Sequence, residues 1–278
     1  MNILSSKFEN LEEVSKKNIK FYKENAPFPH IVFENFFESG FLKKVLNEFP
    51  DLSKISKSEK YNSKNEVKLS YNRYENFSYN TKILINFLNS KKFLNFLNNL
   101  TSVSEELIAD PELSGGGLHQ IKRGGVLKIH TDFNKHPKID IDRRLNLLLY
   151  LNENWQESYG GKLELWDKDM KKAVKKISPD FNKVVIFSTN DFSNHGHPEP
   201  LACPENTSRK SIALYYFSNG RPDSEINKNF VKNTTRFKNR DGYDEVIQKN
   251  EKFKDFLRGF KFYRFLKNIE KKYLRKKK

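Results

Sequence analysis

Two side chains that could bind a metal stand two positions apart, at His130 and Asp132, directly after a short apolar run. On an extended chain, residues two apart point to the same face, so this imidazole and this carboxylate converge. Further imidazoles follow at His195 and His197. Two imidazoles and one carboxylate form the facial triad that binds non-haem Fe(II) and leaves metal positions open. The pattern therefore predicts a metal site of His130, Asp132 and one of the two downstream histidines, His195 or His197.

The open metal positions suit the keto and carboxylate oxygens of a 2-oxo acid together with O2. The distal carboxylate of a dicarboxylic 2-oxo acid needs a cation that forms two hydrogen bonds, and Arg meets this need better than Lys. Arg209 opens an apolar strand, with Ser211 on the same face and Lys210 on the opposite face. We therefore expect Arg209 and Ser211 to bind this carboxylate, with Lys210 as the fallback.

The elements that must position these residues lie between residues 113 and 222, where short apolar runs alternate with Gly, Pro and Asn turns. The expected strands are Leu118–Lys122, Val126–His130, Leu145–Leu151, Lys162–Trp166, Ala173–Ile177, Val184–Ser188 and Ile212–Phe217. Strand runs at this spacing, without helical patterns between them, predict an antiparallel sandwich or barrel.

Residues 1–112 are expected to form a mainly helical support region that contains the first strand. Helical spacing of apolar residues covers 8–24, 41–49 and 83–100, the last as a helix pair or one bent helix, and 30–36 is expected to be a strand. Residues 51–80 are polar, which predicts a long loop that could act as a mobile lid over a site.

The charge of the chain is concentrated at its C-terminal end. The net charge is +16, and residues 231–278 contain 17 Lys and Arg against 6 Asp and Glu. We expect residues 223–278 to form a basic amphipathic helical extension. Its last segment, Phe262–Lys278, could pack on the protein, bind an anionic membrane surface or bind nucleic-acid phosphates. The charge indicates an anionic partner and says nothing about the fold.

The chain has one cysteine, Cys203, which excludes an internal disulfide and a Cys-based zinc site. The first ten residues lack the apolar region of a signal peptide, and no apolar run has the length of a membrane span. We therefore expect a cytoplasmic protein without a transmembrane segment, which the basic tail could bring to a membrane surface as a peripheral protein.

Several motifs in this order resemble the 2-oxoglutarate/Fe(II)-dependent dioxygenases, and most of all their prolyl 4-hydroxylase branch. The likeness rests first on His130-Thr131-Asp132, His195 and Arg209-Lys210-Ser211. It extends over about residues 26 to 222, through segments 27–36, 150–163 and 182–195.

The resemblance implies a mainly β fold with flanking helices, built on a double-stranded β-helix (jelly-roll) core over residues 113–222. It implies Fe(II), 2-oxoglutarate as co-substrate, O2, and ascorbate as an accessory. It also implies hydroxylation of a C–H bond, coupled to oxidative decarboxylation of 2-oxoglutarate to succinate and CO2. By the same resemblance, Tyr150 would touch the co-substrate carboxylate that Arg209 binds.

The sequence leaves the substrate and the distal ligand open. The substrate could be a prolyl peptide, a small molecule, a sugar or a lipid-linked glycan. A protein of another class, a non-catalytic jelly-roll metal- or ligand-binding protein or a basic nucleic-acid-binding module, is the alternative. Arg209 follows His195 by 14 positions and His197 by 12, longer than the family pattern. His195 is preferred because the following Gly196 resembles the usual turn of the family.

Three further residues are candidates for the substrate side of the site or for the support of its ligands. They are His197, Asn146 and His136. Asn146 would share a strand face with Tyr150, four positions later, and His136 lies in a loop before a proline. His119 is expected to be an ordinary strand residue.

Overall fold

The computed structural model describes residues 2–226 and 234–246, and its helices lie in the N-terminal part of the chain. The α-helices are α1 (Leu11–Glu24), α2 (Ser39–Asn47), α3 (Tyr79–Leu88) and α4 (Lys91–Thr101). Their first turns are capped by side chains: Asn10 accepts from the backbone of Glu13, and Glu38 accepts from Gly40 and Phe41. Such caps satisfy N–H groups that have no partner within the helix.

The strands of the described residues belong to one sheet of 13 strands. They are β1 (His30–Glu34), β2 (Glu59–Asn62), β3 (Glu66–Tyr71), β4 (Ile108–Ala109), β5 (Gly117–Lys122), β6 (Val126–Thr131), β7 (Asp142–Tyr150), β8 (Leu163–Trp166), β9 (Ala173–Ile177), β10 (Lys183–Ser188), β11 (His195–His197), β12 (Ser208–Ser218) and β13 (Arg236–Phe237). The main path runs β1-β10-β7-β12-β5-β3-β6-β11-β8-β9, and the pairings along it are antiparallel.

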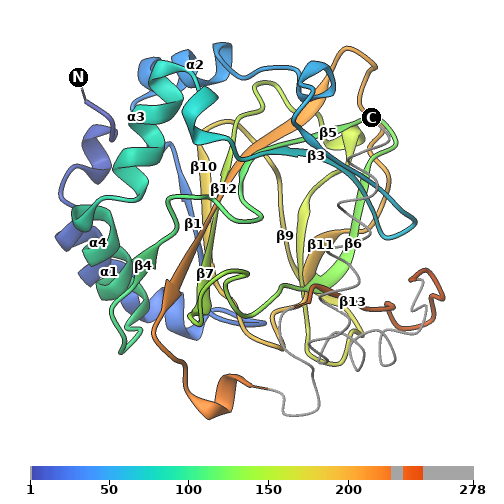
Figure 1. Ribbon diagram of the computed structural model, residues 1–278. Helices are drawn as coiled ribbons and strands as arrows, with labels where there is room; N and C mark the ends of the chain where they lie inside the picture. The colour runs from blue at the N-terminus through green and yellow to red at the C-terminus, as the bar shows by residue number, and fades with distance from the viewer. Residues whose placement is uncertain (1, 227–233, 247–278) are drawn as a thin grey trace.

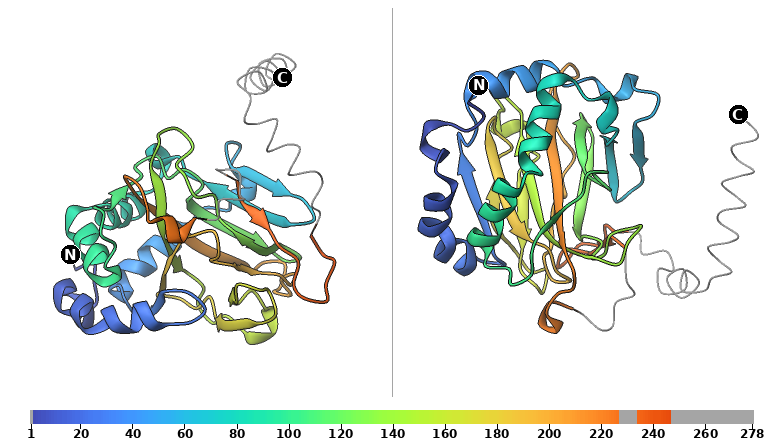
Figure 2. Two further views of the ribbon diagram at one scale, coloured as in Figure 1. Left: turned by 90° about the horizontal axis from the view of Figure 1, so that it is seen from below. Right: turned by 60° about the vertical axis from the view of Figure 1, so that its left-hand side comes forward.

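The sheet curls on itself, so that one half faces the other. Helices α1–α4 cover the outer face of the half that contains β1, β10, β7 and β12, whereas β6 and β11 lie on the opposite side (Figures 1 and 2). Contacts across the interior close the curl: the rings of Phe187 on β10 and His195 on β11 are 4.8 Å apart. The mainly β fold with flanking helices is therefore confirmed.

Alternation along β7 separates the helix-covered core from the interior of the curl. Leu145, Leu147 and Leu149 are fully buried in the apolar cluster that includes the helices. The intervening Asn146 and Tyr150 face the interior, where Tyr150 joins a smaller apolar cluster. Burying each leucine stabilises the fold by roughly 1.5–3 kcal/mol. The outer core thus leaves the interior face of the strand free for polar residues.

The tight turn between β5 and β6 fixes the start of the strand that carries His130. Gly124 has φ +76°, a conformation that favours glycine. A Cβ atom at Gly125 would lie 2.8 Å from the carbonyl oxygen of Val67, which belongs to the neighbouring β3. Only a glycine therefore lets the turn pass this close to β3.

The expectation that residues 51–80 form a long loop is wrong. This segment contains β2 and β3, and β3 lies within the sheet between β5 and β6. The sequence does not predict β3 because Lys68, which lines the interior cavity, is charged, and Glu66 and Ser70, two positions to either side of it, are also polar. The division of the chain at residue 113 stays a prediction.

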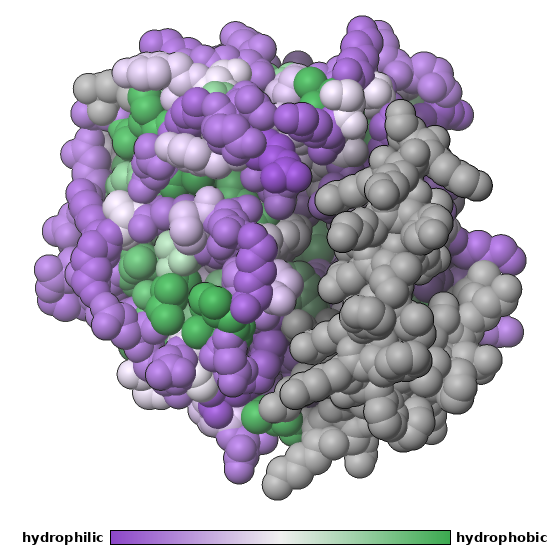
Figure 3. Space-filling view, in the orientation of Figure 1, coloured by the Kyte–Doolittle hydropathy of each residue, from purple (hydrophilic) through white to green (hydrophobic). Residues whose placement is uncertain are grey.

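The predicted basic tail lies mostly outside the described residues, including all of Phe262–Lys278, and its partner stays a prediction. In the part that is described, no helix is both long and apolar enough to cross a membrane. The face of the molecule in Figure 3 is mainly hydrophilic, with a larger apolar area left of centre and smaller ones elsewhere. Short 3-10 turns complete the described elements: η1 (Ser6–Phe8), η2 (Leu52–Lys54), η3 (Tyr74–Asn76), η4 (Glu157–Tyr159) and η5 (Asp223–Glu225).

Candidate metal and 2-oxo acid site

Adjacent strands bring the three predicted metal ligands together. His130 lies near the end of β6, Asp132 follows that strand, and His195 opens β11 directly opposite His130 in the sheet register. One ligand atom from each of the three residues lies within 4.8 Å of the others. All three side chains are buried, so the carboxylate sits in an environment where it needs a counter-charge.

The hydrogen bonds of the two imidazoles leave a lone pair on each facing this centre. His130 Nδ1 donates to the carbonyl of Lys128 at 2.8 Å, and His195 Nδ1 donates to the carbonyl of Ser193 at 3.0 Å. A carbonyl only accepts, so each Nδ1 carries a proton, and the neutral form of such a ring has Nε2 as its acceptor. Backbone carbonyls orient metal-binding histidines in this way.

Acceptor atoms therefore meet without a donor between them. Nε2 of His130 lies 3.5 Å from Asp132 Oδ1, and Nε2 of His195 lies 3.4 Å from Asp132 Oδ2. Burial lowers the pKa of His195 to about 4, which keeps this ring neutral near pH 7. Lone pairs facing one another in a buried site repel, and a cation among them removes the repulsion. The donor set fits Fe(II) with open positions.

Two residues of β7 contact the carboxylate of Asp132. Asn146 Nδ2 donates to Asp132 Oδ2 at 2.7 Å, and Arg143 Nη2 lies 3.0 Å from the same oxygen. Burial alone would raise the pKa of Asp132, but this pKa stays well below its usual range, and the positive charge of Arg143 is the largest cause that lowers it. The carboxylate is therefore ionised and fixed in orientation.

Arg143 was not predicted as a site residue, although it is among the most buried side chains of the structure. Its guanidinium lies 3.4 Å from the ring centroid of Tyr215 and 4.4 Å from that of Phe133. Its Nε and Nη2 also donate to Asn146 Oδ1. The sequence feature that could have identified Arg143 is a charged residue at the start of an otherwise apolar strand.

The second end of the site is built around Arg209 on β12. Its Nε donates to the carbonyl of Gly161 at 2.9 Å, and its Nη2 donates to the hydroxyl of Tyr150 at 3.1 Å. Gly161 has φ +72°, and a Cβ there would lie 3.1 Å from Arg209 Cδ. The turn before β8 thus requires glycine in order to aim its carbonyl at the guanidinium.

The face of β12 agrees with the alternation that the sequence predicted. Arg209 and Ser211 line one cavity together with the metal triad, whereas Lys210 lies half-buried on the other face. The residues that line this cavity are Lys68, His119, Ile121, Leu127, His130, Asp132, Asn146, Leu148, Leu163, His195, Gly196, His197, Arg209, Ser211 and Tyr215. One cavity therefore contains a cation site at one end and a guanidinium at the other.

Two more imidazoles face this cavity. His197 is 3% exposed, and neither of its ring nitrogens has a hydrogen-bond partner. His119 has an unpartnered Nε2, and burial lowers its pKa to about 3. Burial, and next Arg209, hold the pKa of His197 well below its usual range. His197 does not belong to the group that His130, Asp132 and His195 form.

His136, in contrast, lies outside the cavity. Its Nε2 is 3.2 Å from Ser114 Oγ and 3.5 Å from Asp110 Oδ2. Its Nδ1 accepts from the backbone of Lys138 and Ile139. Ser114 and Asp110 both contact Nε2, whereas a catalytic triad has its serine and its aspartate on different ring nitrogens. The cluster therefore holds the 133–141 loop in place.

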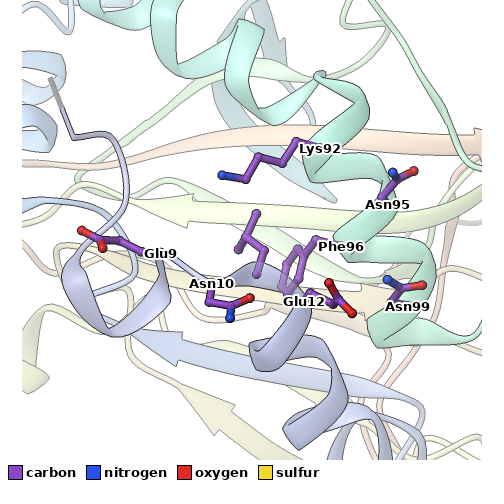
Figure 4. Close-up of a pocket in the computed structure, with 8 residues that line it drawn as sticks. Glu9, Asn10, Glu12, Lys92, Asn95, Phe96 and Asn99 are labelled. Carbon is purple, nitrogen blue, oxygen red and sulfur yellow. The ribbon is translucent and has the colours of Figure 1, made fainter.

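A different hollow lies on the helical side of the molecule, between α1 and α4 (Figure 4). It is lined by polar side chains, among them Asn10, Glu12, Lys92, Asn95 and Asn99, with Phe96 at its floor. It is open to solvent and lies on the helical side of the sheet, whereas β6 and β11, which carry His130 and His195, lie on the other side (Figure 1). It lacks the buried polar groups that mark the interior cavity.

Comparisons with known proteins agree with this geometry. The family model of the 2OG-Fe(II) oxygenase superfamily matches residues 116–217. Prolyl 3-hydroxylase OGFOD1 of Mus musculus is 27% identical over 205 residues, which cover 69% of this chain and 33% of that protein. Its Xenopus laevis counterpart is 30% identical over 185 residues, with 64% and 33% covered. The chain thus spans about a third of the length of these curated relatives.

Solved structures share the fold. A prolyl hydroxylase from Trichoplax adhaerens, in complex with a hypoxia inducible factor peptide fragment, aligns with a TM-score of 0.56 at 18% identity, covering 76% of this chain and 92% of that one. A Pseudomonas putida prolyl-4-hydroxylase aligns with a TM-score of 0.52 at 12% identity, covering 74% and 100%. The architecture is therefore the double-stranded β-helix fold of these enzymes, and residues 116–217 are similar to the 2OG-Fe(II) oxygenase superfamily.

Proposed function

We propose that this chain is an Fe(II)- and 2-oxoglutarate-dependent dioxygenase that hydroxylates prolyl residues of a peptide or protein. The observation that carries the proposal is one cavity with a buried His130, Asp132 and His195 centre at one end and Arg209 at the other. A dicarboxylic 2-oxo acid matches both ends, because one end of it chelates a metal and the other is an anion.

Each residue has a defined task in this proposal. His130 and His195 offer Nε2 atoms oriented by backbone carbonyls, and Asp132 offers a carboxylate that Asn146 and Arg143 orient. When bound, the metal, 2-oxoglutarate and O2 supply oxidative decarboxylation, in which one oxygen atom enters succinate and the other enters the substrate. The protein residues bind and orient these groups and exclude water from the buried centre.

The 2-oxoglutarate would lie with its distal carboxylate against Arg209. The guanidinium is held by Gly161 and Tyr150, so little of its rotamer freedom is lost on binding. The hydroxyl of Tyr150 accepts a hydrogen bond from Arg209, so the hydroxyl hydrogen of Tyr150 is available for the same carboxylate. Ser211, which pairs with Tyr150 in the sheet, lines the cavity.

A prolyl substrate is the finer part of the proposal. It is supported by the relatives, which are named prolyl 3-hydroxylases, and by the prolyl-hydroxylase fold. A small molecule, sugar or lipid-linked glycan would use the same two ends of the cavity and remains the second candidate. A cytoplasmic location and a stimulating effect of ascorbate belong to the same proposal, and the single cysteine, free and buried, agrees with a reducing compartment.

The first test measures succinate from 2-oxoglutarate, with protein reconstituted anaerobically with Fe(II) and then exposed to O2, with and without ascorbate. We expect slow turnover without substrate, and none from His130→Ala. If the wild-type chain binds neither Fe(II) nor 2-oxoglutarate, the proposed activity is wrong.

The second test identifies the substrate class. Proline-containing peptides and proteins should stimulate succinate formation and gain one oxygen atom by mass spectrometry, and amino-acid analysis of the product locates the hydroxyl group on the ring. Stimulation by small molecules or glycans alone would replace the prolyl substrate with the second candidate and leave the dioxygenase proposal intact.

A further inference from the structure

The cavity contains one imidazole, His197, that the metal site does not use. His195 and His197 are the first and last residues of β11, and both line the cavity. The sheet register shifts between them, so that His195 lies opposite His130 and His197 lies opposite Leu127. His195 Nδ1 is bonded to the backbone, whereas both ring nitrogens of His197 lack a partner.

An unpartnered polar group in a buried position requires an explanation. His197 is 3% exposed, so bulk water does not satisfy its ring. The backbone of Glu199 approaches the ring and raises the pKa of His197 slightly against the effect of burial, but the approach does not have the geometry of a hydrogen bond. Buried polar atoms in folded proteins are almost always paired, and those left unpaired at the wall of a cavity point to a ligand atom.

The surroundings of His197 specify the charge of that ligand. Arg209 and Lys68 are its cationic neighbours, and both line the cavity. Lys68 has a partner of its own, Glu66, at 3.3 Å. Arg209 directs Nε and Nη2 at protein acceptors, which leaves its remaining N–H groups and the imidazole N–H of His197 for the cavity. The buried carboxylate that lines this cavity, Asp132, is already paired with Arg143 and Asn146, so the free N–H groups of Arg209 and His197 favour an anionic ligand.

We propose that His197 donates a hydrogen bond to a carboxylate oxygen of the bound dicarboxylic 2-oxo acid. The inference rests on the proposed function and deepens it, because it names a residue that selects the co-substrate. In either neutral tautomer an imidazole presents one N–H, so the ring supplies a donor without adding a permanent charge. His197 is thus a specificity-determining residue that lines the same cavity as the metal ligands and Arg209.

The test compares His197→Val, which removes the donor, with His197→Gln, which keeps an N–H at a similar reach. Calorimetry on the full chain loaded with Mn(II) measures the dissociation constant of 2-oxoglutarate. We expect His197→Val to weaken binding by about 10- to 100-fold, the effect of one hydrogen bond to a charged group. His197→Gln should recover most of the loss. Ile129→Val, a change of one methylene on the facing strand at a residue that does not line the cavity, is the matched control and should bind like wild type.

A second ligand identifies the carboxylate. 2-Oxobutyrate keeps the carboxylate next to the keto group and lacks the distal one. If His197→Val weakens both ligands equally, His197 bonds the carboxylate at the metal end; if only 2-oxoglutarate is weakened, it bonds the distal carboxylate. Either result supports the proposal.

Other results would overturn it. An unchanged 2-oxoglutarate affinity in His197→Val refutes the hydrogen bond. Loss of Mn(II) from His197→Val, with Mn(II) retained in His195→Ala, would make His197 a metal ligand instead. If His197→Val does not fold, nitrogen-15 NMR of labelled histidines in the wild type replaces it: 2-oxoglutarate should shift the ring resonances missing from His197→Gln, and no shift refutes the proposal. A wild type that binds Mn(II) without binding 2-oxoglutarate overturns the proposed function and this inference together.

Discussion

At one end of the cavity, His130, His195 and Asp132 turn acceptor atoms toward one another; at the other end, Arg209 and His197 turn N–H groups inward. The two ends are opposite in charge and also differ in how they are held. Backbone carbonyls and β7 side chains fix the acceptor end, whereas a glycine carbonyl and a tyrosine hydroxyl fix the guanidinium. Converging acceptors need a cation, and converging donors need an anion. A ligand that chelates a metal and ends in a carboxylate satisfies both.

The largest expected effect follows from removing a ligand at the acceptor end. His130→Ala and His195→Ala should each reduce Mn(II) affinity by more than about 100-fold, since even the partners that orient metal ligands contribute 10- to 100-fold. Calorimetry or the electron paramagnetic resonance signal of free Mn(II) measures this. Thr131→Val is the matched control, because Thr131 lies between the ligands and its buried hydroxyl has no hydrogen-bond partner.

The same experiment decides between the two candidate distal histidines. His197→Ala should retain Mn(II), because its ring is not part of the group within 4.8 Å. Metal binding that survives in His195→Ala and disappears in His197→Ala would reverse the assignment and contradict the comparison of the two ends.

The next-largest effect is expected when the N–H groups of Arg209 are removed and the metal ligands are left intact. Arg209→Ala should weaken 2-oxoglutarate binding by about 100-fold or more, because two charge-assisted hydrogen bonds are lost. Mn(II) affinity should stay within about threefold of wild type, because Arg209 makes no contact with the triad side chains. Calorimetry with each ligand separates the two constants.

Lys210→Ala is the control for this prediction. Lys210 lies on the opposite face of β12 and does not line the cavity. Burial lowers the pKa of Lys210. Weak binding in Lys210→Ala with normal binding in Arg209→Ala would transfer the anchor to the lysine and disprove the strand alternation on which the site rests.

A smaller effect is expected from the residues that orient the carboxylate. Asn146→Ala removes the 2.7 Å hydrogen bond to Asp132 Oδ2 while Arg143 remains at 3.0 Å. We expect Mn(II) affinity to fall by about 10-fold, at the lower end of the range for such partners. An affinity equal to wild type would mean that Arg143 alone orients Asp132. A thermal melt confirms that the variant is folded.

The sequence predicted the ends of the cavity better than its walls. His130 and Asp132 lie together because residues two apart on a strand end share a face, which is a local property of the chain, whereas His195 joins them through the pairing of β11 with β6. Arg209 and Ser211 were located by the same rule on β12. Local patterns also placed α3, α4 and β7, which have strong apolar periodicity.

The walls depend on contacts between residues far apart in the chain. Lys68 reaches the cavity because β3 inserts between β5 and β6, and no local pattern reports that pairing. Arg143 supports Asp132 only once β7 faces the end of β6. His136 was a plausible site residue by position, but the chain folds its loop toward Asp110 and Ser114 instead.

The smallest effect should come from charges outside the cavity, of which Asp51 is an example. Its hydrogen bond with Ser53, and then Lys122, lowers the pKa of Asp51 to about 2, although partial burial opposes them. A folded-state pKa below the unfolded value means that this stability is present above the ordinary pKa and disappears as the pH falls toward 2. Because the side chain is 35% exposed, water screens the pair, and Asp51→Asn should cost under about 1 kcal/mol at pH 7. Urea unfolding at pH 7 and pH 3 should show a smaller difference in unfolding free energy between the two proteins at pH 3.

The affinities of Asp51→Asn for Mn(II) and 2-oxoglutarate should match wild type, because Asp51 contacts neither end of the cavity. A change in either affinity would mean that charges beyond the buried groups tune the site.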